Sequence, residues 1–195
     1  MSFDQLISSG LAASRTDDSE QAIRFFQQAG VAAPDVGLPQ FLLGAEYAAL
    51  GDMDQAEAAF ANAVRLAPDF PLARYQLGLL QFSSGRAAVG LLTWQPLLEL
   101  PESDPLPHFV NGFSALAQDQ LAEALAFCEQ GLQRNTSNPA LSADIEKVMA
   151  GIRVAMARND GETVTGSEPE VGEEDAVDAS IHVFLANYQQ NGPKH

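Results

Sequence analysis

Residues 37–70 read GLPQFLLGAEYAALGDMDQAEAAFANAVRLAPDF, the segment of the chain that is most informative about secondary structure. Gly51 separates two segments rich in apolar residues, and glycine is the residue that most often ends a helix in the left-handed conformation. Small residues, Gly44 and Ala56, stand where two helices would cross, and the bulky Phe60 follows Ala56 by one turn. The stretch therefore predicts two antiparallel helices joined by a tight turn.

The same features recur along the chain with a period of 34 residues. Glycines keep this period at Gly10, Gly44, Gly78 and Gly112. Prolines keep it at Pro71, Pro105 and Pro139. Small residues keep it at Ala22, Ala56, Gly90 and Ala124, and the apolar slot four places later holds Phe26, Phe60, Trp94 and Cys128. Series that coincide at one period indicate a stack of repeated helix pairs, each of which buries its apolar face against its neighbours.

The period and its slots resemble the tetratricopeptide-repeat (TPR) family, whose repeat carries Leu-Gly, Tyr, Ala, Phe and Pro at fixed positions. The second copy fills nearly every slot, with Leu43, Gly44, Tyr47, Gly51, Ala56, Phe60, Ala63 and Pro68. The copies at 3–36, 71–104 and 105–138 keep the spacing with fewer of the residues. The resemblance implies an all-α, right-handed TPR solenoid of about four helix-turn-helix repeats over residues 3–138.

The second helix of the third copy departs from the pattern. Pro96 lies inside it and is expected to kink or shorten it, because proline lacks the backbone N–H and clashes with the preceding turn. The segment from Ala87 to Leu100 is also almost entirely apolar, and a helix that is apolar all round is normally buried on every side. Tight packing between repeats, another segment of the chain, or another protein could cover its outer face.

Residues beyond the repeats predict a cap and a tail. Residues 139–158 carry an apolar stripe at helical spacing, typical of the capping helix that a repeat array needs. The stripe consists of Leu141, Ile145, Val148, Met149 and Ile152. Residues 159–176 are acidic and predict a disordered linker. A short amphipathic helix is predicted over 177–190, and we expect it to dock on the array or to exchange between copies as a dimer.

Composition excludes several classes of partner. The net charge is −16 and the pI about 4.3, whereas nucleic acids and anionic membranes bind surfaces rich in Lys and Arg. Cys128 is the single cysteine, so no internal disulfide can form. The N-terminus has no basic start with a long apolar run, and no stretch is long enough to span a membrane. We therefore predict a cytoplasmic protein that binds neither nucleic acid nor membrane.

The sequence offers little for catalysis. The histidines His108, His182 and His195 are scattered, and none is paired with another ligand at helical spacing, so no metal site is predicted. Cys128 fills an apolar repeat slot and is interpreted as a core residue. We predict no catalytic residue, no cofactor and no enzymatic activity.

The resemblance to TPR proteins implies that the first helix of each repeat lines a concave groove. The residues assigned to the peptide-binding groove are Phe41, Ala45, Tyr75, Leu79, Phe82, Phe109 and Phe113, and the corresponding slots of the first copy hold Ile7, Leu11 and Ser14. TPR domains that clamp a carboxylate carry Lys, Arg and Asn at such places, and here the slots are apolar apart from Ser14. The expected function is a protein-interaction adaptor, a scaffold that binds an apolar peptide segment or helix. The alternative is a chaperone-like TPR protein of a secretion system that holds a hydrophobic client.

Overall fold

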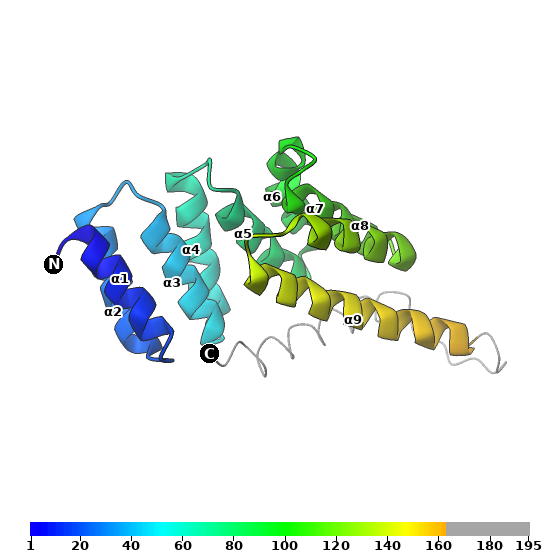
Figure 1. Ribbon diagram of the computed structural model, residues 1–195, viewed down its shortest axis with the longest axis horizontal. Helices are drawn as coiled ribbons and strands as arrows, with labels where there is room; N and C mark the ends of the chain where they lie inside the picture. The colour runs from blue at the N-terminus through cyan, green and yellow to red at the C-terminus, as the bar shows by residue number, and fades with distance from the viewer. Residues whose placement is uncertain (163–195) are drawn as a thin grey trace. The chain divides into compact units, whose positions relative to one another are not determined.

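The computed structural model describes residues 1–162, with side chains to residue 158. This part of the chain is helical throughout, with nine α-helices, one 3₁₀ helix and no strand (Figure 1). The elements are α1 (Phe3–Ser14), α2 (Ser19–Ala32), α3 (Leu38–Ala49), α4 (Met53–Leu66), α5 (Pro71–Ser83), α6 (Ala87–Trp94), η1 (Gln95–Glu99), α7 (Pro105–Leu116), α8 (Leu121–Arg134) and α9 (Pro139–Glu162). The helix predicted over 177–190 lies outside the described residues, as does the predicted linker from residue 163 on.

The described residues form two compact units, one of residues 1–81 and one that begins at Phe82, so that the boundary falls near the end of α5. In the first unit α1 packs on α2, α3 packs on α4, and α2 packs on α3. In the second unit α7 packs on α8, and α8 packs on α9. The helix pairs α1/α2, α3/α4 and α7/α8 are therefore the predicted helix-turn-helix units of the first, second and fourth copies.

Glycine at the crossing point sets the distance within each helix pair. A Cβ on Gly44 would lie 2.6 Å from the nearest ring atom of Phe60, closer than real Cβ contacts come. A Cβ on Gly10 would likewise overlap the ring of Phe26. The glycine slot therefore lies against the apolar slot sixteen residues later, and this contact explains why both slots keep the same period.

The turns inside the helix pairs share one backbone conformation. Gly51 and Gly85 have φ of 79° and 78°, the left-handed conformation predicted for Gly51. Asp17 and Asp119 occupy the same slot in the first and fourth copies, and their φ values are 58° and 57°. Aspartate tolerates this conformation better than most residues because its short side chain can bond locally, but it is less favourable there than glycine.

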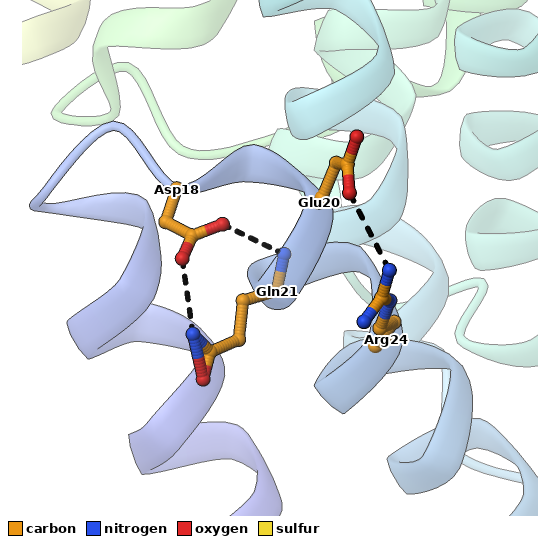
Figure 2. A network of polar contacts seen from close by, with 4 residues as sticks. All are labelled: Asp18, Glu20, Gln21 and Arg24. Carbon is orange, nitrogen blue, oxygen red and sulfur yellow. Dashed lines mark hydrogen bonds and ion pairs between the residues drawn. The ribbon is translucent and has the colours of Figure 1, made fainter.

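Aspartates after these turns cap the second helix of the first two pairs. The Asp18 side chain accepts hydrogen bonds from the Gln21 backbone N–H (3.1 Å) and from Gln21 Nε2 (3.0 Å), as Figure 2 shows. An exposed ion pair between Glu20 and Arg24 (3.4 Å) lies on the next turn of α2. Asp52 Oδ1 accepts from the Gln55 N–H (3.2 Å) at the start of α4. A carboxylate here satisfies an N–H that has no partner within the helix and complements the positive end of the helix dipole.

Proline begins the helices α7 and α9, directly after Asp104 and Asn138. Asp104 Oδ1 accepts from the Leu106 N–H (2.9 Å), and Asn138 Oδ1 accepts from the Leu141 N–H (3.1 Å). Proline suits the first helical position because its missing N–H would have no partner there.

Pro96 shortens the second helix of the third copy, as predicted. The helix α6 ends at Trp94, and the chain continues as the 3₁₀ helix η1 through Glu99, whereas the second helices α2, α4 and α8 are each 14 residues long. The loop after η1 contacts α7 and α8 through the Glu102 backbone carbonyl. This oxygen accepts a hydrogen bond from Arg134 Nε of α8 (2.9 Å) and lies 2.9 Å from His108 Nε2 of α7.

The helix α9 buries the predicted apolar stripe. All five of its residues are buried, namely Leu141, Ile145, Val148, Met149 and Ile152. Polar residues lie at its edges: Lys147 pairs with Asp144 (3.3 Å), and Arg153 reaches Glu129 of α8 (3.5 Å). The helix continues to Glu162, four residues beyond the predicted end at 158.

Candidate protein-binding surface

The groove slots of the first unit remain partly open to solvent on α1 and α3. On α3, Ala45 is exposed and Phe41 is half-buried. The ring centroid of Phe41 lies 4.8 Å from that of Phe70 and 5.8 Å from that of Phe60, so the core supports one side of the ring. On α1, Ile7 and Leu11 are half-buried against the core of the first unit.

The remaining groove slot residues of the first unit, Tyr75 and Leu79 on α5, are buried in the folded chain. Tyr75 has no exposed surface, and Leu79 is 8% exposed. The structure thus separates these two side chains from Phe41 and Ala45 by their access to solvent, although the sequence assigned all four to one surface.

The groove slot residues of the second unit, Phe82, Phe109 and Phe113, are also buried. Phe82, Trp94 and Phe113 form a cluster of three rings with centroid separations of 5.1–5.7 Å, which joins the end of α5 to α6 and α7. The ring of Phe109 lies against Gly131 of α8, in the space that a Cβ on that residue would need. These three side chains therefore contribute to helix packing in the second unit.

The open slots form an uncharged, apolar surface on α1 and α3. Neither helix contains a Lys or Arg, so no cation is available there to clamp a carboxylate. Ala45 and Ala49 on α3 are exposed and have short apolar side chains. A surface of this kind can bind apolar groups.

A second exposed apolar surface lies on α6 and η1. Val89, Leu92 and Leu98 are 43%, 70% and 47% exposed, whereas Trp94 and Leu97 of the same segment are buried. The sequence showed that this segment is too apolar for an outer helix but left open what covers it. In the described structure, packing between helices buries only one side of it.

Cys128 is unsuited to nucleophilic chemistry. Its side chain is buried against Gly112 of α7. Burial, with a smaller contribution from the negative charge of Glu129, raises the pKa of the Cys128 thiol from its ordinary value of 9.0 to about 12. The thiolate, which is the reactive form, is therefore scarce at neutral pH.

The described residues hold neither a metal-binding cluster nor a helix that could span a membrane. Residues 1–158 contain no group of three His, Cys, Asp or Glu side chains placed to hold a metal ion. Within the same part of the chain, none of the helices has the length and apolar character needed to cross a membrane.

Comparisons with known proteins agree with the helical repeat. Residues 40–70 match the family model of the tetratricopeptide repeat, and no curated protein sequence matches the chain significantly. Two solved structures of MamA share the fold. One is titled "MamA 41-end from Desulfovibrio magneticus RS-1", with 13% identity, TM-score 0.59, and coverage of 99% of this chain and 97% of that one. The other is a double mutant of MamA RS-1, with 14% identity, TM-score 0.58 and the same coverage.

A third similar structure is PilW, described as a widely conserved type IV pilus biogenesis factor. Its identity to this chain is 17% and its TM-score 0.58, and the match covers 99% of this chain and 94% of PilW. At these identities the similarity shows the fold alone. The fold supports a general role in protein–protein interaction, because TPR arrays serve as binding scaffolds and are in general not catalytic. The repeat spacing, the helix pairs and the family match over residues 40–70 together support a tetratricopeptide-repeat protein.

Proposed function

We propose that this protein is an interaction adaptor that binds an apolar peptide segment or helix, and that the partner contacts the groove side of α1 and α3. One observation carries the proposal: Phe41 and Ala45, one helical turn apart on α3, are the groove residues assigned from the sequence that keep access to solvent. Residues four apart on a helix lie on the same face, so one ligand can touch both.

The chemistry of this surface favours an apolar ligand. The accessible part of Phe41, together with Ile7 and Leu11 of α1, offers side chains without charge or hydrogen-bonding groups. Burying an apolar side chain of a partner there stabilises the complex by about 1.5–3 kcal/mol for each Val, Leu or Phe that is fully covered. A charged ligand would lose its hydration without gaining a partner of opposite charge.

The buried groove residues have a different part in this proposal. Contact of a partner with Tyr75, Phe82, Phe109 or Phe113 would require local opening of the fold, because these side chains have almost no exposed surface. The proposal therefore assigns recognition to Phe41 and Ala45, and it assigns to the buried aromatic residues the packing of the helix pairs. The lone buried thiol is compatible with a reducing compartment, so we place the adaptor in the cytoplasm.

Selection from a peptide library displayed on phage would test the proposal. The wild-type chain should enrich peptides with apolar or aromatic residues at repeated spacing, and Ala45→Glu should weaken their binding at least about tenfold, because a carboxylate would be buried against an apolar ligand. The matched control is Ala61→Glu, which makes the same change at an exposed alanine of the second helix α4 and should leave binding unchanged. Enrichment of strongly charged peptides, or equal loss in both variants, would contradict an apolar groove on α3.

A further inference from the structure

The exposed face of α6 and η1 has an unusual distribution of charge. Residues 87–98 contain no charged side chain, and this uncharged stretch is bounded by Arg86 at its start and Glu99 at its end, both exposed. The middle of the stretch falls at Leu92 and Thr93, and Leu92 is the most exposed large apolar side chain of α6 and η1, at 70%. An apolar centre with opposite charges at its two ends is complementary to itself when one copy is turned end to end.

We propose that this face is a self-association surface, on which a second copy of the chain docks antiparallel about a two-fold axis near Leu92. A two-fold interface uses the same patch on both copies, so that residue i meets residue j and residue j meets residue i. Leu92 then lies beside Leu92 of the second copy, and Arg86 of each copy meets Glu99 of the other. The eight residues of α6 and the five of η1 put the two charged ends roughly 20 Å apart, so only the antiparallel arrangement brings both pairs together.

The structure explains why this face is available in the third copy. Pro96 ends the α-helix and the 3₁₀ helix η1 follows, so Trp94 and Leu97 point into the core while Val89, Leu92 and Leu98 remain exposed. A contiguous exposed apolar patch on a monomer marks an interaction surface more often than isolated apolar residues do. The face lies within the second unit and shares no residue with α1 or α3, so this inference does not depend on the proposed function.

The size of the face predicts a weak dimer. Three large apolar side chains and their neighbours cover less area than the standard interface of about 1,600 Å². The net charge of −16 on each copy also opposes association, although at physiological salt such repulsion is screened beyond about 8 Å. We therefore expect a dissociation constant on the order of 10–100 μM, typical of a small interface.

Sedimentation equilibrium of the full chain at physiological salt tests the proposal. The wild type should dimerise in this concentration range, and Leu92→Glu should be monomeric. The matched control is Leu50→Glu, an exposed leucine (58%) in the first unit, which should dimerise like the wild type. A wild type that stays monomeric at about 1 mM, or equal loss of association in both variants, would overturn the proposal.

Charge exchange tests the antiparallel arrangement. Arg86→Glu alone and Glu99→Arg alone each turn two attractive pairs into two repulsive ones, and each should weaken dimerisation about tenfold. The double variant Arg86→Glu/Glu99→Arg restores opposite charges across the two-fold axis and should return to within about threefold of the wild type. Single variants that weaken association without rescue by the double variant would overturn the antiparallel pairing.

Disulfide trapping gives an independent readout. A cysteine at position 92 lies beside itself at a two-fold axis, so Leu92→Cys should form a covalent dimer on mild oxidation. Leu50→Cys should not, and the buried Cys128 should not contribute to either product. Equal trapping at both positions would show random collision and contradict a defined interface.

Discussion

The crossing of the helix pairs predicts a specific result for alanine at the repeated glycines. In the second copy, a Cβ on Gly44 would lie 2.6, 2.7 and 2.9 Å from three ring atoms of Phe60, which is buried and cannot swing aside. In the fourth copy, a Cβ on Gly112 would lie 2.9 Å from Cys128 Sγ and 3.3 Å from the Ala124 carbonyl oxygen. In the fourth copy, a single side-chain atom lies closer than 3.0 Å to the added Cβ. In the second copy, three atoms of a rigid ring do.

Two opposing effects set the change in the free energy of unfolding when one of these glycines is replaced by alanine. Alanine stabilises a helix by about 1 kcal/mol relative to glycine, and overpacking a core costs about 1–3 kcal/mol. We expect Gly44→Ala to lower the free energy of unfolding by about 1–2 kcal/mol, because three ring atoms must move. Gly112→Ala should cost about 0–1 kcal/mol, because only Cys128 Sγ is closer than 3.0 Å and the Ala124 carbonyl oxygen, at 3.3 Å, must move less. Gly151→Ala, where α9 leaves open space around the glycine, should gain about 0.5–1 kcal/mol.

A double-mutant cycle tests the geometry directly. Cys128→Ala removes the Sγ atom that the new methyl group would meet, so Gly112→Ala should be less costly in that background by about 1 kcal/mol. Urea denaturation followed by far-UV circular dichroism would measure all four members of the cycle. If the two changes add within about 0.3 kcal/mol, or if Gly44→Ala is as stable as Gly151→Ala, the close crossing described here is wrong.

Two substitutions and the titration of Cys128 test other parts of the fold. Asp119→Gly should raise the free energy of unfolding by about 0.5–1 kcal/mol, since glycine adopts the left-handed turn without strain; unchanged or lower stability by urea denaturation would contradict this. Cys128 should react with a thiol reagent at pH 8 only after unfolding. Because its folded pKa is raised from 9.0 to about 12, its contribution to stability is complete below pH 9 and is lost as the pH rises toward 12, which pH-dependent denaturation would detect. Phe109→Ala should cost about 3–5 kcal/mol, because the ring is fully buried against Gly131; a loss below about 1 kcal/mol would show that Phe109 is not a core residue.

Much of the fold follows from local rules that the sequence states directly. Gly44 and Phe60 share a period because one fills the space that the other leaves, and Gly51 ends its helix because glycine adopts positive φ at little cost. The helix α6 ends shortly before Pro96, because proline has no backbone N–H to donate to the helix. The left-handed conformation of Asp119 is harder to predict from the sequence, because aspartate at a turn is also typical of a helix cap.

The solvent exposure of the groove residues was harder to predict, because it depends on how far each side chain is buried between neighbouring helices. Phe41 and Phe109 occupy equivalent slots, yet Phe41 keeps some access to solvent and Phe109 has none. In the fourth copy the facing slot on the second helix holds Gly131, whose missing side chain gives the Phe109 ring its place. The equivalent slot of the second copy holds Ala63. Gly131 was therefore the signal in the sequence that a groove aromatic would become a core residue.

We predict that a protein partner contacts the groove side of α3. Site-specific incorporation of a photo-crosslinking amino acid at position 45, in the cell that makes the protein, tests this contact most directly. The control places the same amino acid at position 61, an exposed alanine on α4. We predict discrete protein adducts from position 45 that are absent from position 61. The same adducts from both positions, or adducts from position 61 alone, would contradict the proposed binding surface.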